Sequence, residues 1–198
     1  VTRVMAHLLS NHVKAVVIAC NTATAVAAKE LRETYDLPIL GMEPALKPAH
    51  ALRHGGSILV LATPMTLRLE KLYARYGEGA IPLPCPGLME LVEQEANEQA
   101  RRYLLELLHP YDLRTVDAVV LGCTHYVFLR PLLREILPEN VQVLDGNEGT
   151  ARQLRRVLTE NDLLCARETP GKITLETSGA PETVLPVMQR LLVRADTL

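Results

Sequence analysis

Short apolar runs and longer amphipathic stretches alternate along the whole chain. Two apolar runs, residues 15–19 and 118–121, are typical of strands buried in a parallel sheet, and Gly122 ends the second. Residues 23–35 are rich in helix formers, so residues 15–41 predict a β-α-β unit that closes with a strand at 37–41. Further strands are expected at residues 57–62, 81–85, 141–144 and 173–177, and further helices at 44–53, 67–76, 87–108, 130–137, 149–159 and 181–192.

This alternation of strand and helix predicts an α/β fold with mostly parallel sheets flanked by helices. Prolines restrict residues 81–85 to a short edge strand, because proline cannot donate to a sheet ladder. No linker or low-complexity segment divides the chain, so any boundary between domains is subtle.

The same short motif follows the two apolar runs of residues 15–19 and 118–121. The first run ends in Cys20-Asn21-Thr22, and the second leads through Gly122 to Cys123-Thr124-His125. Loops at the carboxyl ends of strands are where open α/β sheets bind their ligands. The repetition therefore predicts two like half-structures that face each other, with one thiol on either side of a shared cleft.

Each Cys-Thr corner combines a reactive thiol with an anion-binding surface. A thiol at the N-terminus of a helix gains thiolate character, and the free backbone N–H groups there can hold a carboxylate. Asn21 or Thr22 is expected to cap the helix that follows Cys20. Two such corners across a cleft could hold the α-carbon of a small acid between Cys20 and Cys123. One thiol would remove a proton and the other would return one from the opposite face, which inverts the stereocentre without a cofactor.

These residue types also allow other interpretations. An isolated cysteine is most often a small buried hydrophobe, which is our expectation for Cys85 and Cys165. A metal site is disfavoured, because the chain has no CxxC motif and no paired histidines. Nucleophilic catalysis by Cys123 and His125 would leave the second corner unexplained. For Glu93, a place on the solvent-exposed face of a helix explains the sequence as well as a role in the active site does.

Composition narrows the class of protein. Hydrophobic residues make up 48% of the 198, enough for one good core or two small ones. The formal net charge is −2 and the chain has no stripe of lysine and arginine, so nucleic-acid binding has little support. No apolar run approaches the length of a membrane span, and no signal peptide is evident. We expect a cytoplasmic protein whose four cysteines are thiols.

At its two Cys-Thr corners the chain resembles the aspartate/glutamate racemase family. VVIACNTATAVA (residues 16–27) and VDAVVLGCTHYVFLRPLL (116–133) resemble the two cysteine motifs of its glutamate racemases. The family's connecting segments are similar to residues 37–49, 61–68 and 144–154, and its C-terminal segment is similar to residues 177–182. The resemblance implies two pseudo-symmetric α/β domains, residues 1–41 with 148–198 and residues 42–147, and an active site in the cleft between them. It places the last strand and helix on the first domain.

The resemblance also implies the activity and the roles of individual residues. The activity is interconversion of L- and D-glutamate without pyridoxal phosphate, which supplies D-glutamate for peptidoglycan. Cys20 would take the proton from D-glutamate and Cys123 from L-glutamate, with His125 and Glu93 assisting the thiols. The residues expected to hold or line the substrate are Asn21, Thr22, Thr66 and Thr124. The oligomeric state is not decided, and a homodimer is kept as one option.

Two segments of the family pattern do not occur in this chain. Members begin with a strand and an Asp-Ser-Gly turn and later carry a Pro-Tyr-Gly segment, neither of which is present. We therefore expect a racemase that lacks an N-terminal portion, with one sheet strand and one pocket wall missing, and a chain that is weakly active or inactive and associates through its exposed first-domain edge. Two alternatives stay open: a racemase of aspartate or another acidic amino acid, and a truncated paralogue that binds an acidic ligand or a partner without turnover.

Overall fold

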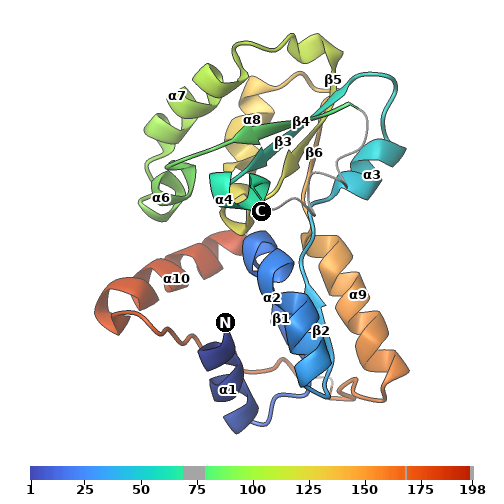
Figure 1. Cartoon of the computed structure of the whole chain (residues 1–198). Helices are drawn as coiled ribbons and strands as arrows, with labels where there is room; N and C mark the ends of the chain where they lie inside the picture. Colours follow the sequence, from blue (N-terminus) through green and yellow to red (C-terminus); the bar gives the residue numbers. More distant parts are fainter. Residues whose placement is uncertain (69–78, 168, 197–198) are drawn as a thin grey trace.

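A computed structural model describes residues 1–68, 79–167 and 169–196. Its strands form two separate parallel sheets, one in each half of the molecule (Figure 1). The predicted α/β class with parallel sheets flanked by helices is confirmed, since every strand pair is parallel. The predicted helix at 67–76 lies mostly outside the described residues.

The smaller sheet holds two strands, β1 (Val16–Ile18) and β2 (Ile39–Gly41), joined by α2 (Asn21–Thr34). This is the β-α-β unit that the apolar pattern predicts. Its core contains Met5 of α1 (Thr2–Ser10) together with Val16, Leu31 and Ile39. In Figure 1, α9 (Asn147–Glu160) lies along the β2 side of this half, and α1 lies near its lower end.

The larger sheet has the strand order β4-β3-β5-β6. Its central strands are β3 (Ser57–Ala62) and β5 (Val116–Leu121), flanked by β4 (Ala80–Pro84) and β6 (Gln142–Leu144). The proline-containing β4 lies at an edge, as predicted. From β3 the chain passes to β4 on one side and then crosses to β5 on the other. The carboxyl ends of β3 and β5 therefore form a topological switch point, where α/β sheets bind ligands.

The two faces of the larger sheet bury different residues, because side chains alternate along a strand. Leu59, Leu61, Val119 and Leu121 enter one apolar cluster. That face is covered by α6 (Leu88–Glu93), α7 (Asn97–Leu108) and α8 (Arg130–Ile136). The alternate residues of β3 and β5 enter a second cluster together with Leu46 and Ala49 of α3 (Leu46–Ala51).

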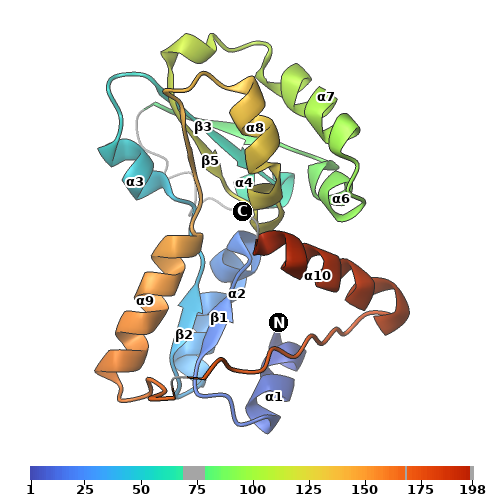
Figure 2. The ribbon, with the colours of Figure 1, turned by 180° about the vertical axis from the view of Figure 1, so that it is seen from behind.

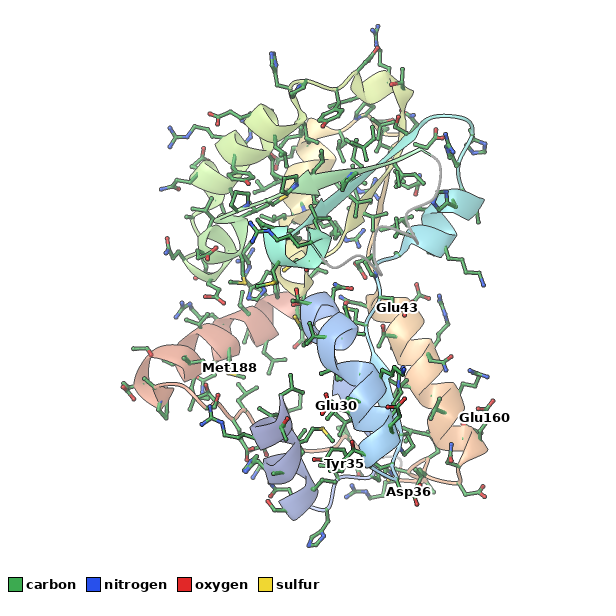
Figure 3. All side chains as sticks on the ribbon, in the orientation of Figure 1. Glu30, Tyr35, Asp36, Glu43, Glu160 and Met188 are labelled. Carbon is green, nitrogen blue, oxygen red and sulfur yellow. The ribbon has the colours of Figure 1, made fainter. Side chains whose placement is uncertain are left out.

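The chain crosses between the two halves at two adjacent points. It leaves β2 through Glu43, labelled in Figure 3 where the halves meet, and returns after β6 through Gly146. A Cβ built on Gly146 would lie 2.5 Å from the carbonyl oxygen of Glu43. Only glycine therefore allows the two crossing segments to run this close together.

Two predictions about secondary structure are wrong. Residues 173–177 form no strand, and Ile173 is 69% exposed, because no strand edge pairs with this segment in the described structure. The predicted helix at 87–108 is two helices, separated at Glu95, which has a left-handed backbone with φ of 55°. The N–H groups of Glu95 and Ala96 donate back to Val92 and Leu91, which is the Schellman arrangement that ends a helix.

The C-terminal helix α10 (Pro181–Ala195) lies beside the smaller sheet but reaches the larger half. Figure 2 shows the segment between α9 and α10 running across the lower half past α1. The resemblance placed this helix on the first domain, yet its ion pairs and its ring contact are with Glu95 and Phe128 of residues 42–147. In Figure 3, Met188 marks the middle of α10.

Candidate active site

Cys20 lies directly at the N-terminus of α2 and is exposed. It is itself the N-cap residue: its Sγ accepts a hydrogen bond from the N–H of Ala23 at 3.5 Å. The prediction that Asn21 or Thr22 caps this helix is therefore wrong. Capping by the sulfur places the thiol among free backbone N–H groups at the positive end of a fourteen-residue helix.

Cys123 lies at the carboxyl end of β5, where the 3₁₀ helix η2 (Thr124–Leu129) begins. The preceding Gly122 is required, because a Cβ there would lie 2.9 Å from the Leu61 carbonyl oxygen of β3. Burial raises the pKa of the Cys123 thiol, and the nearby Cys20 raises it further. Hydrogen bonds from the backbone of His125 and Tyr126 and from the Thr124 side chain oppose that rise in pKa.

His125 and Glu93 form a chain of polar contacts behind the Cys123 thiol. The His125 Nδ1 atom lies 3.8 Å from Cys123 Sγ, and its Nε2 atom lies 3.0 Å from Glu93 Oε1. The carboxylate thus fixes the orientation of the imidazole ring, which in turn faces the sulfur. Such a carboxylate–imidazole–thiol series can pass a proton to and from a thiol.

The two cysteine corners are joined directly by Asn21. Its side-chain Nδ2 donates to the carbonyl oxygen of Gly122 at 2.9 Å, and the side chain is only 5% exposed. Its Oδ1 atom is buried and has no hydrogen-bond partner among the described residues. Because a buried amide oxygen normally has a partner, this oxygen is suited to accept from a bound ligand such as an ammonium group.

Threonine hydroxyls form a second link between the two halves. Thr22 Oγ1 of α2 lies 2.6 Å from Thr66 Oγ1 of α4 (Pro64–Leu67), and Thr66 Oγ1 lies 2.9 Å from Thr63 Oγ1. Thr63 caps α4 by accepting from the N–H of Thr66. The sequence analysis missed Thr63 as a site residue, although a threonine followed by proline is a typical helix start.

The structure thus brings the predicted residues to one place between the sheets. Cys20, Asn21 and Thr22 come from the smaller half, and Cys123, Thr124, His125, Glu93 and Thr66 from the larger. Cys85 is buried, as predicted, and burial raises the pKa of its thiol to about 12. The same prediction is wrong for Cys165, which is exposed. The described residues hold no group of three histidine, cysteine or acidic side chains arranged to bind a metal ion.

The link through Asn21 leads to a prediction about stability. Asn21→Ala removes the hydrogen bond to Gly122 and leaves a buried carbonyl oxygen without a partner, which should lower the free energy of unfolding by about 1–3 kcal/mol. Chemical denaturation measures this change. Asn161→Ala is the matched control, since Asn161 Nδ2 donates to the Val157 carbonyl on the exposed surface and its loss should cost only about 0.5 kcal/mol. Equal effects of the two variants would show that Asn21 does not link the corners.

The amino-acid sequence of this chain is similar to those of known proteins. The family model described as Asp/Glu/Hydantoin racemase matches residues 1–154. The chain is 44% identical over 193 residues to a glutamate racemase of Clostridium perfringens, covering 93% of this chain and 74% of the relative. It is 47% identical over 192 residues to a glutamate racemase of Bifidobacterium adolescentis, covering 92% of this chain and 74% of the relative.

Solved structures show the same likeness. Escherichia coli glutamate racemase, in complex with L-glutamate and the activator UDP-MurNAc-ala, superposes with a TM-score of 0.74 at 33% identity, covering 96% of this chain and 77% of that one. The glutamate racemase isoform RacE1 of Bacillus anthracis has a TM-score of 0.80 at 28% identity, covering 95% and 74%. Separately, no helix in the described part of this chain is both long and apolar enough to cross a membrane.

Proposed function

This chain belongs to the Asp/Glu/hydantoin racemase family, and we propose that it racemises glutamate with Cys20 and Cys123 as its two bases. It is an amino-acid racemase, an isomerase of the kind that works without pyridoxal phosphate, and it interconverts L- and D-glutamate. In bacteria D-glutamate is a component of peptidoglycan. The observation that carries the two-base proposal is the pair of Cys corners that Asn21 joins across the two halves.

In the proposed reaction the α-carbon of glutamate lies between the two sulfur atoms. Cys123, assisted by His125 and Glu93, removes the α-proton of L-glutamate, and Cys20 protonates the opposite face to give D-glutamate. In the reverse direction Cys20 removes the proton and Cys123 returns one. Each turnover leaves the thiol that removed the proton protonated and the other deprotonated, which reverses the starting state, so the two sulfur atoms must exchange protons with water before a second turnover in the same direction.

The other polar groups of the site would bind and orient glutamate. The unpartnered Asn21 Oδ1 is placed to accept from the substrate ammonium group. Free N–H groups at the start of α2 are suited to a carboxylate. The hydroxyls of Thr22, Thr66 and Thr124 complete the proposed binding set, since the first two contact each other and the third bonds to Cys123.

The proposal extends to the organisation of the molecule. Residues 1–41 with 148–198 form one domain and residues 42–147 the other, with the adjacent crossings near Glu43 and Gly146 as the hinge. We propose that the protein is cytoplasmic and keep a homodimer as one option for its oligomeric state. Exposed apolar side chains such as Val4 and Val17, 51% and 38% exposed, support association. Analytical ultracentrifugation would detect the dimer.

Turnover in deuterated water tests the proposed chemistry. With two bases on opposite faces, product formed from either enantiomer of glutamate should carry solvent deuterium at the α-carbon, measured by mass spectrometry and NMR. In ordinary water, α-deuterated substrate should give product without the label. Substantial transfer of the label from substrate to product would indicate one base acting on both faces and would contradict the proposal. Aspartate in the same assay tests the substrate, and faster turnover of aspartate would exclude glutamate as the preferred acid.

A further inference from the structure

The C-terminal helix α10 holds a single carboxylate of the larger half with two arginines. Arg190 Nε lies 3.2 Å from Glu95 Oε2, and Arg194 Nη1 lies 3.6 Å from Glu95 Oε1. Both arginines lie on one face of the helix, four residues apart. Glu95 is 40% exposed and Arg194 only 28%, so the arrangement is partly shielded from water.

Arg194 also contacts the 3₁₀ helix η2. Its guanidinium carbon lies 5.2 Å from the centroid of the Phe128 ring, a cation–π distance, and its Nη2 donates to the Phe128 carbonyl oxygen at 3.5 Å. Leu191, between the two arginines in the sequence, packs against the apolar cluster of the larger sheet. The helix is therefore attached by charge, by a ring and by apolar contact at the same place.

Both attachment points adjoin the residues behind the Cys123 thiol. Glu95 follows Glu93 by two residues, at the strained left-handed position that ends α6. Phe128 follows His125 by three residues within η2. The Glu93 carboxylate and the His125 ring must meet at 3.0 Å, yet they come from separate segments, and α10 contacts both segments.

The segment between α9 and α10 contacts the smaller half. Within it, Glu176 Oε2 lies 2.6 Å from His7 Nε2 of α1, and the Leu163 carbonyl accepts a hydrogen bond from Lys14. Cys20, by contrast, is held by the start of α2, whereas the described polar contacts of α10 are with Glu95 and Phe128. The described contacts of α10 with the larger half therefore lie on the segments that carry Glu93 and His125, which is the Cys123 side of the site.

We propose that α10 is a positioning clamp for one of the two bases. Through their contacts with Glu95 and Phe128, the two arginines Arg190 and Arg194 hold the Glu93–His125 pair in position beside the Cys123 thiol. This inference rests on the proposed two-thiol racemase function. Arg190 and Arg194 are positioning residues, since their described contacts are with Glu95 and Phe128. Releasing α10 therefore slows the proton transfer at Cys123 and leaves the transfer at Cys20 unchanged.

The test uses the doubly substituted protein Arg190→Gln with Arg194→Met. The two enantiomers of glutamate have equal free energies, so kcat/KM must fall by the same factor in both directions, here about tenfold for a small displacement of a base. The asymmetry appears instead in the α-deuterium isotope effects on kcat/KM. The effect should rise for L-glutamate, whose proton leaves to Cys123, and fall for D-glutamate, whose proton leaves to Cys20.

Two further variants separate positioning from general stability. Arg156→Gln removes an arginine from a surface ion pair with Glu160 on α9 and should leave both isotope effects at their wild-type values. Arg190→Lys with Arg194→Lys keeps both charges beside Glu95 but loses the guanidinium contact with Phe128, so it should restore part of the activity and bring the isotope effects back toward their wild-type values. Circular dichroism melts confirm that each variant is folded at the assay temperature.

The outcomes are distinct. A rise for L-glutamate with a fall for D-glutamate, partly reversed in the lysine variant, supports the clamp. A loss of activity with both isotope effects unchanged, or no loss at all, overturns the clamp while the two-base function stands. A wild-type protein that does not racemise glutamate overturns the proposed function, and the clamp is rejected with it.

Discussion

Cys20→Ala and Cys123→Ala are each expected to abolish the racemisation of glutamate in both directions. Racemisation needs a base on one face of the α-carbon and an acid on the other, and each variant lacks one of them. Loss of a positioned proton-transfer group typically slows a reaction by about 10²–10⁴-fold. The change in circular dichroism of a glutamate solution with time measures the rate.

The same two variants can show which thiol serves which enantiomer. Cys20→Ala retains Cys123 and should still exchange the α-proton of L-glutamate with deuterated water, whereas Cys123→Ala should exchange only that of D-glutamate. Cys165→Ala is the control, because Cys165 is exposed and contacts only Arg167 among the hydrogen bonds found. Near-wild-type racemisation by either alanine variant at Cys20 or Cys123 would exclude the two-base assignment.

His125→Asn is expected to lower kcat by about 10²-fold or more, with the larger isotope effect on L-glutamate. Burial and the neighbouring Cys20 raise the pKa of the Cys123 thiol, so at neutral pH the thiol is mostly protonated and needs a partner to become a base. We propose the His125 ring, 3.8 Å from the sulfur, as that partner. Because the thiolate fraction grows with pH, the activity of the variant should recover in part as pH rises.

A matched substitution controls for loss of a histidine. His109 ends α7 on the surface, with no contact to the site among the described interactions, and His109→Asn should retain wild-type activity at every pH. Glu93→Gln should give an intermediate loss, since it weakens the orientation of the ring without removing it. If His125→Asn and His109→Asn behaved alike, His125 would have no part in proton transfer.

Local patterns in the sequence were sufficient for most of the helices and strands. The apolar runs that became β3 and β5 are fully or almost fully buried, so their alternation with helices could be read without knowing their neighbours. The prediction of a strand at residues 173–177 was wrong because a strand forms only beside a partner strand, and the sequence does not show which sheet edge is free. The break between two helices at Glu95 was not predicted, because glutamate rarely adopts the left-handed backbone conformation that it has here.

The sequence predicted only part of the candidate site. The repeated cysteine corners identify Cys20 and Cys123 as a pair, but their roles as bases, like those of the residues around them, stay predictions. The sequence marks Thr63 as the start of a helix, but it does not show that Thr63, Glu95 and Phe128 lie near the site, because that depends on how distant segments pack. The capping of α2 by a sulfur atom was also missed, because side-chain oxygens are the usual helix caps.

By itself the sequence determined the α/β class, the two strands that end in cysteine motifs and the family, since these depend on residue order within a few turns of chain. Only the tertiary structure decided how the corners meet. The hydrogen bond from Asn21 to Gly122 joins residues 101 positions apart, and the Glu93–His125 contact joins residues 32 apart. Which long-range pairs form depends on the packing of both sheets and on the close crossing at Gly146, and no local pattern contains that information.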